Sequence, residues 1–133
     1  VFTTAFSRRG LIAEHGISWM LPQLIGPQGA MDLLLSARKV TAPEALRLSL
    51  VAQVFPEASF QDEVRAYATE LATLTSPRSM RVMKSQLYKA LFQSLGEATE
   101  SANEEMTGSF ESEDFREGVA HFLEKRAPAF TGR

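Results

Sequence analysis

The sequence has no cysteine among its 133 residues. This absence excludes a disulfide framework and zinc held by thiolates, and it fits a reducing compartment, so we expect a cytoplasmic protein. No apolar run approaches the roughly 18 residues that span a bilayer, and we expect no membrane partner. Lys and Arg number 14 against 16 Asp and Glu, a net charge of -2, so no basic field favours nucleic acid as a partner.

What the chain does contain is the composition of one globular domain, with 44% hydrophobic and 23% charged residues. A chain of this length can bury one core but not two. Alternating side chains in "VFTTAF" (1–6) predict a strand, and "LVAQVFP" (50–56) predicts a second one. A single strand cannot pair its own edges, so we expect its partners either later in the chain or outside it.

Helical patterns fill most of the remaining sequence. The segment "ISWMLPQLIG" predicts a helix that stops at Gly26 and Pro27, and "GAMDLLLSA" predicts a second short helix. We expect Thr41 to cap a third helix in a capping box with Glu44, because Pro43 suits the first turn of such a helix.

The second half of the chain predicts only helices. Apolar residues recur at helical spacing over 60–74, and the Ser-Pro pair at 76–77 is typical of a helix start. Ser94 and Glu97 have the spacing of a capping box. We expect the helix that they open to turn Met106 inward.

The stretch from Glu97 to Asp114 carries seven acids and no Lys or Arg. Its spacing lacks the alternating ligands and central glycine of a calcium loop, so we expect a solvated face and no metal site.

The stretch "GLIAEHGISWML" (10–21) places a carboxylate and a histidine between apolar residues. Glu14 and His15 directly precede a predicted helix start at Gly16. A negative charge is favoured at this end of a helix, so a capping acid is one interpretation of Glu14.

Two long segments carry a family resemblance. "AFSRRGLIAEHGISWMLPQLIGPQGAMDLLLSARKVTAPEALRLSLVAQVFP" resembles the middle of the crotonase, or enoyl-CoA hydratase/isomerase, superfamily: a buried strand, a Gly-Leu turn, a short acidic or Gly-rich loop, then "LP..iG...A..l.l....i.A.eA...glV..v.p". The chain's end, "FREGVAHFLEKRAPAFTGR", resembles the same family's C-terminal "rEG..aFleKR.p.F.G". The resemblance covers the whole chain and keeps its spacing.

This resemblance implies the C-terminal part of an α/β crotonase-like (ClpP/crotonase) fold, mainly α-helical with one or two short strands. Residues 1–56 would end the spiral core and carry the Glu14 loop, and residues 57–133 would form a helical oligomerisation region. An N-terminal half of the same protein would supply most of the CoA cleft and an oxyanion hole of two backbone N–H groups. Because the family forms trimers and hexamers through its C-terminal helices, the resemblance also implies a homotrimer or a hexamer.

The resemblance also bears on the catalytic acids. Phe6 aligns with a glutamate of the hydratases, and an apolar ring can neither activate water nor donate a proton. Glu14 aligns with the acid of members that have isomerase activity, which implies a catalytic acid/base; a carboxylate that merely caps the helix is the alternative. Because an upstream glutamate would restore hydratase chemistry, the choice between hydratase and isomerase stays open.

Three further residues match substrate-binding positions of the family. Trp19 would line the acyl pocket, with core packing as the alternative. Phe122 would approach the adenine of CoA and Lys125 its phosphates, while Phe122 could instead pack in the core.

Two functions follow from the resemblance. The first is a hydratase (lyase) or isomerase acting on acyl-CoA thioesters, as in fatty acid metabolism, with CoA as part of the substrate and no other cofactor. The second is a non-catalytic helical assembly fragment of the same family.

Overall fold

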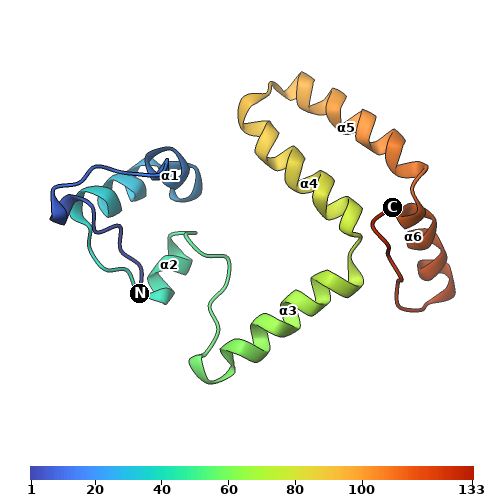
Figure 1. Cartoon of the computed structure of the whole chain (residues 1–133), viewed down its shortest axis with the longest axis horizontal. Coiled ribbons are helices and arrows are strands. Elements are labelled where there is room, and N and C mark those ends of the chain that lie inside the picture. The colour runs from blue at the N-terminus through green and yellow to red at the C-terminus, as the bar shows by residue number, and fades with distance from the viewer. The chain divides into compact units, whose positions relative to one another are not determined.

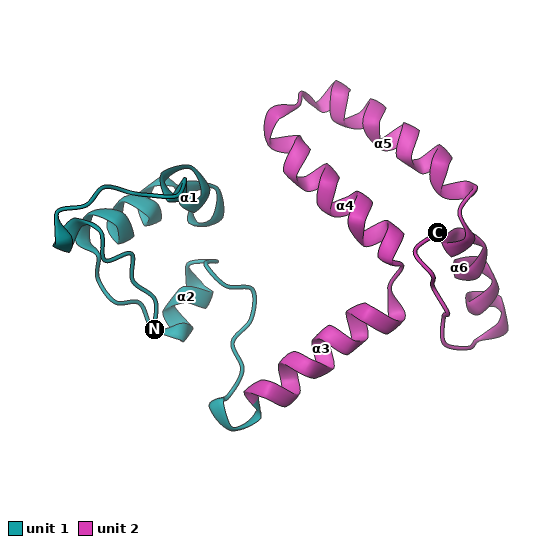
Figure 2. Ribbon diagram, in the orientation of Figure 1, with its two compact units in different colours: residues 1–59 teal, residues 60–133 magenta.

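The computed structural model describes residues 1–133, and helices make up most of it (Figure 1). The chain divides into two compact units, which Figure 2 shows in teal and magenta. Unit 1 comprises Val1–Ser59 and unit 2 comprises Phe60–Arg133. None of the helices is both long enough and apolar enough to cross a membrane.

The longest helix of unit 1, α1 (Ile17–Ser36), is broken in its middle. Gly26 has φ 74° and ψ 162°, outside the helical region, and Pro27 follows it. The predicted stop at these two residues is therefore confirmed as a kink between two helical segments. Glycine suits this position because a side chain would be strained at positive φ.

The short helix α2 (Ala42–Arg47) has Pro43 in its first turn, as predicted. The predicted capping box is wrong, because the Thr41 side chain makes no capping hydrogen bond. Glu44 instead pairs with the Arg38 guanidinium, at 2.8 Å. A charge-assisted contact with a guanidinium is stronger than a bond to a neutral backbone N–H.

Extended structure in unit 1 is reduced to one bridge, in which Phe2 and Val40 exchange two backbone hydrogen bonds of 2.8 and 2.9 Å. Ala5, with φ 56°, ends the extended run before the 3-10 helix η1 (Ser7–Arg9). The strand predicted over 50–56 is wrong: this segment consists of bends and irregular backbone before η2 (Glu57–Ser59). A strand needs a neighbour for its ladder, and no second strand lies beside either segment in the structure.

The core of unit 1 lies between α1, α2 and the bridge. Its buried residues are Leu21, Ala30, Leu33, Val40 and Ala45. This core holds the start of α1 in place, and the Glu14 loop leads directly into that start.

Unit 2 contains α3 (Phe60–Leu74), α4 (Pro77–Lys89), η3 (Ala90–Phe92), α5 (Leu95–Phe110) and α6 (Glu113–Glu124). Two predicted helix starts are confirmed. The Ser76 hydroxyl accepts a hydrogen bond from the Ser79 N–H at the start of α4, and Ser94 and Glu97 form the capping box of α5. α4 and α5 lie side by side and are joined by a tight connection through η3 (Figure 1).

Unit 2 buries no apolar side chain; its only buried residues are Ser76 and Asp114. Met106, which was expected to turn inward, lines a cavity beside Val82 and Met83 of α4 but is 51% exposed. The stripe of α3 from Phe60 to Leu74 is also largely exposed. The helical faces predicted from sequence are therefore present in unit 2, but most of their large apolar side chains stay exposed.

Candidate active site

The loop that carries Glu14 is shaped by residues with left-handed backbone. Gly10 (φ 70°) ends η1, and His15 (φ 55°) and Gly16 (φ 76°) turn the chain into α1. Left-handed backbone is unfavourable for a side chain such as that of His15, so this turn is held at a cost. The Glu14 carbonyl accepts a hydrogen bond from the Ile17 N–H, at 3.1 Å, which ties the loop to the first turn of α1.

The Glu14 carboxylate does not cap the helix. Gly16 is the N-cap of α1, and no side chain makes a capping hydrogen bond there. The carboxylate's contact is with His15, whose Nε2 lies 3.7 Å from Oε2 of Glu14. The Glu14 side chain is 40% exposed and that of His15 is 89% exposed. The Glu14 carboxylate is therefore accessible to solvent.

Trp19 lies in the first turn of α1, 42% exposed, and it is not part of the buried core cluster. A cavity of about 410 Å³ lies on the same unit, lined by α1, the bridge and the residues after α2. Its wall includes Ile17 and Leu21, but neither Glu14 nor Trp19 lines it. Within unit 1 the two predicted residues therefore do not share an enclosed site.

Phe122 and Lys125 belong to the end of α6 in unit 2. Phe122 is 77% exposed, so the alternative that it packs in a core is wrong for this chain. Lys125 ends the helix with left-handed backbone, φ 54° and ψ 40°, and its N–H donates to the His121 carbonyl. The ring and the ammonium group are thus both on the surface at one helix end.

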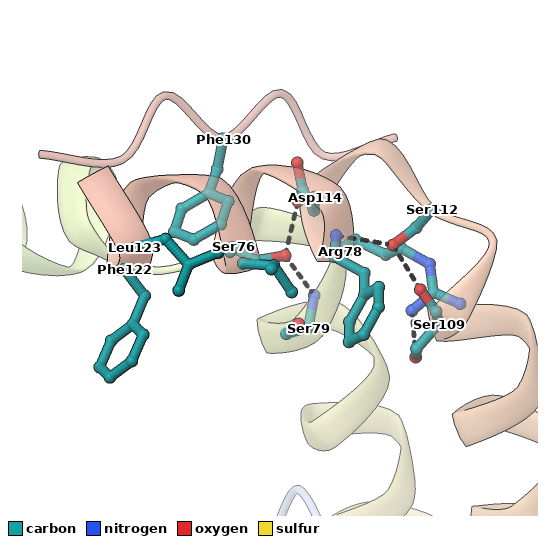
Figure 3. Close-up of a pocket in the computed structure, with 12 residues that line it drawn as sticks. Ser76, Arg78, Ser79, Ser109, Ser112, Asp114, Phe122, Leu123 and Phe130 are labelled. Atoms are coloured by element: carbon teal, nitrogen blue, oxygen red, sulfur yellow. Dashed lines mark hydrogen bonds between the residues drawn. The ribbon is translucent and has the colours of Figure 1, made fainter. Parts of the chain in front are cut away.

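Phe122 also lines the edge of a second cavity, of about 410 Å³, which is drawn in Figure 3. Its wall comprises Ser76, Arg78, Ser79, Ser109, Ser112, Asp114, Phe115, Gly118, Val119, Phe122, Leu123 and Phe130. In Figure 3 the polar residues gather where α4 meets the start of α6, and Phe122 and Leu123 lie at the other end. The cavity is therefore apolar at one end and hydrogen-bonded at the other.

Asp114 is the centre of the polar end and is only 3% exposed. Its carboxylate accepts hydrogen bonds from the Ser76 hydroxyl at 2.5 Å, the Thr131 N–H at 2.8 Å and the Gly132 N–H at 3.0 Å. The expectation that every acid of 97–114 is solvated is thus wrong for Asp114. The acidic run gave no sign of this, because the partners lie 38 residues before it and 17 residues after it.

Burial by itself raises the pKa of Asp114, but hydrogen bonds from the Ser76 hydroxyl and from backbone N–H groups outweigh it. The net effect lowers the pKa of Asp114 below its ordinary value. A carboxylate held in its charged form by donors from two other segments is suited to fastening those segments to α6, not to exchanging protons.

Sequence reasoning also missed an ion pair after α6. Glu117 receives two hydrogen bonds from the Arg126 guanidinium, one of them 2.8 Å, and a third from the Ala129 N–H at 2.7 Å. The Arg126 guanidinium and this N–H lower the pKa of Glu117 to about 2. Glu124 accepts a further bond from Nε of Arg126, at 2.6 Å. The "FLEKR" segment (122–126) indicated that this helix ends in charged residues. It did not indicate which of the two cations, Lys125 or Arg126, forms ion pairs.

No group of three His, Cys, Asp or Glu side chains in the structure could hold a metal ion. The predicted site residues comprise an accessible carboxylate at the start of α1 and an ammonium group with an aromatic ring at the end of α6.

Comparison with known proteins places these residues in one family. The family model for enoyl-CoA hydratase/isomerase matches residues 1–133. A probable enoyl-CoA hydratase of Rhodobacter capsulatus is 38% identical over 133 residues, which is 99% of this chain and 51% of that protein. The 1,2-epoxyphenylacetyl-CoA isomerase of Escherichia coli is 32% identical, over 99% of this chain and 50% of that protein.

Solved structures agree with these sequence relatives. A putative enoyl-CoA hydratase of Streptomyces coelicolor A3(2) superposes with a TM-score of 0.91 at 31% identity, covering 99% of this chain and 48% of that one. This chain therefore has a crotonase-type fold over the part it matches, and it spans about half the length of the relatives.

Proposed function

Because this chain belongs to the enoyl-CoA hydratase/isomerase family, we propose that it is the C-terminal part of an enzyme that acts on acyl-CoA thioesters, with Glu14 as the acid/base. The observation that carries this proposal is the carboxylate of Glu14. It lies at the entry to α1 in a loop with left-handed backbone, is partly exposed, and is not used to cap the helix.

The proposed chemistry is a 1,3-proton shift. Glu14 takes a proton from C2 of a 3-enoyl thioester, and the electron pair of that C–H bond moves onto the thioester carbonyl as an enolate. When Glu14 returns the proton at C4, the double bond has moved from C3–C4 to C2–C3. An oxyanion hole in an N-terminal half would stabilise the enolate, and such donors are worth several kcal/mol each.

Phe6 supports isomerisation over hydration in this proposal. Hydration needs an activated water and a proton donor, and a phenyl ring at the matching position provides neither. A hydratase would therefore require its second carboxylate from outside residues 1–133. Relatives of both kinds, hydratases and isomerases, match this chain at 32–38% identity.

Substrate binding is proposed for three residues. Trp19, partly exposed beside the Glu14 loop, would line the acyl pocket. Phe122 would stack on the adenine and Lys125 would bind phosphates of CoA, both from the end of α6. CoA is part of the substrate here, and no separate cofactor is required.

The proposed assembly is a homotrimer or hexamer that also contains an N-terminal half of the same protein. The exposed apolar stripes of unit 2 support it, because faces of this kind are stabilised when a partner covers them. The same observation favours the second candidate function, a helical assembly module without catalysis.

Replacing Glu14 by Gln tests the catalytic proposal. The variant Glu14→Gln keeps the shape of the side chain but cannot exchange a proton, so turnover of an enoyl-CoA by the assembled enzyme should fall at least about a hundredfold. Glu104→Gln, at an exposed acid of α5, is the matched control and should leave turnover unchanged. Unchanged turnover in Glu14→Gln would overturn the assignment, and no turnover in the assembled wild type would favour the assembly module.

A further inference from the structure

Two adjacent cations, Lys125 and Arg126, lie at the end of α6, and only Arg126 is paired with carboxylates. Arg126 is fully engaged: its guanidinium bonds to Glu117, to Glu124 and to the Ala127 carbonyl. Lys125 forms no ion pair in the structure, although the carboxylates of Glu117 and Glu124 lie on the same helix. Of the two cations, only the lysine is therefore available to an external anion.

The backbone at Lys125 is also unusual for its residue type. Its left-handed φ of 54° is the conformation that glycine adopts at helix C-termini without a steric penalty. A side chain there is sterically unfavourable, because its Cβ approaches the following carbonyl oxygen. Non-glycine residues that keep such strain cluster at functional sites, so the position is consistent with a role for the ammonium group.

Arg126 contacts this turn through both its backbone and its side chain. Its backbone N–H donates to the His121 carbonyl at 3.2 Å, one residue beyond the Lys125 N–H, which donates to the same carbonyl. Glu117 ties the guanidinium back to α6 and also accepts the Ala129 N–H, so the chain after the helix is anchored as well.

We propose that Arg126 is a positioning residue for Lys125: by occupying Glu117 and Glu124 it keeps the lysine unpaired and its turn fixed, ready to bind a phosphate of acyl-CoA. This rests on the proposed function, in which Lys125 binds those phosphates. Without Arg126, the carboxylates of Glu117 and Glu124 would be left without their cation. One of them would then pair with Lys125, and both would repel an incoming phosphate.

The test separates phosphate binding from folding by using two ligands. The dissociation constant of adenosine 3′,5′-bisphosphate is measured by calorimetry, and KM and kcat are measured for an enoyl-CoA and for the same enoyl group on pantetheine, which lacks the nucleotide phosphates. Lys125→Gln and Arg126→Gln are each expected to raise the dissociation constant and the KM for the CoA thioester about fivefold, the scale of one partly exposed ion contact. The KM for the pantetheine thioester and both kcat values should stay unchanged.

The double variant should be no weaker than Lys125→Gln alone, because Arg126 acts through the lysine. Arg126→Lys, which keeps the charge but not the forked geometry, should give a smaller rise, again for the CoA thioester only. Arg116→Gln removes a cation from an exposed, unpaired position on the same helix and is the control for net charge.

Three results would overturn the proposal. The first is additive effects of Lys125→Gln and Arg126→Gln on the dissociation constant, which would show independent roles. The second is an equal change in KM for both thioesters in Arg126→Gln, which would show that Arg126 is merely structural. If Arg126→Gln does not fold, the same measurements on Arg126→Lys decide between these two outcomes. The third result concerns Lys125. If Lys125→Gln leaves phosphate binding unchanged, the binding role of Lys125 fails and the positioning role fails with it, whereas a failure confined to Arg126 leaves the proposed function standing.

Discussion

At the scale of single residues, Asp114 joins three parts of unit 2. Its side chain binds the start of α4 through Ser76 and the end of the chain through Thr131 and Gly132, and its own N–H donates to the Arg133 carbonyl. Both of its carboxylate oxygens accept hydrogen bonds, and no buried polar side-chain atom in the structure lacks a partner. Such a carboxylate is expensive to replace.

Asp114→Asn should lower the free energy of unfolding by about 2 kcal/mol, the usual scale for disrupting hydrogen bonds to a buried charge. The amide keeps the volume of the side chain but turns an NH2 group toward donors that need an acceptor. Urea unfolding followed by circular dichroism measures the change. Glu111→Gln, at an exposed acid before α6, is the control, and an equal loss in both variants would contradict the role given to Asp114.

The lowered pKa of Glu117 predicts that the free energy of unfolding falls in acid. Its pKa in the folded chain is about 2, below the ordinary value of 4.5. Since the folded-state value is the lower one, the stability from Glu117 is complete above pH 4.5 and is lost as the pH falls toward about 2.

Urea unfolding at a series of pH values from 6 down to about 2 should show this loss. Glu117→Gln should flatten the decline, because the amide does not titrate. Glu104→Gln should keep the wild-type profile. A decline in Glu117→Gln as steep as that of the wild type would assign the acid sensitivity to other groups.

At the scale of elements, the two predicted capping boxes had opposite outcomes. Ser94 and Glu97 lie within one turn and make both reciprocal hydrogen bonds, so the local pattern was sufficient. Glu44 has an alternative partner in Arg38, and Thr41 is left without a side-chain bond. A local rule fails where a charged group from another segment offers a stronger contact.

This difference gives a paired prediction. Ser94→Ala should destabilise the chain by about 1 kcal/mol, the typical effect of losing an N-cap, whereas Thr41→Ala should change stability by only a few tenths of a kcal/mol. Denaturant titrations of the two variants under the same conditions measure both values. Equal losses would mean that Thr41 caps α2 in solution.

At the scale of the whole molecule, the two units differ in what stabilises them. Unit 1 has a small apolar core, whereas unit 2 buries only two residues, both polar, and leaves its apolar stripes exposed. Burial of apolar surface is the main favourable term in folding, so unit 2 is expected to gain most of its stability from surfaces that other chains or segments cover.

The chain is therefore expected to associate. Its midpoint of thermal unfolding should rise with protein concentration, because a partner that binds only the folded form stabilises it by mass action. Calorimetry over a hundredfold range of concentration, with sedimentation velocity on the same samples, checks this. A monomer whose midpoint is independent of concentration would contradict it.

Features that depend on residues close together in the sequence were predicted correctly, and features that depend on distant segments were not. The helix break at Gly26, the start of α4 at Ser76 and the capping box at Ser94 were all predicted, because each depends on residues within about one turn. The strand over 50–56 was not formed, because a strand exists only beside another one. The accessible carboxylate of Glu14 was predicted as a candidate, but that it leaves the helix uncapped required the structure.

By itself, the sequence determined the family and the places where most helices begin, since both are recorded in local patterns of glycine, proline, capping residues and apolar spacing. Only the tertiary structure decided that Asp114 is buried and that Arg126, not Lys125, takes up the nearby carboxylates. The physical reason is that the electrostatic environment of a side chain depends on which distant segments fold against it, and the spacing of charges along a chain does not specify that.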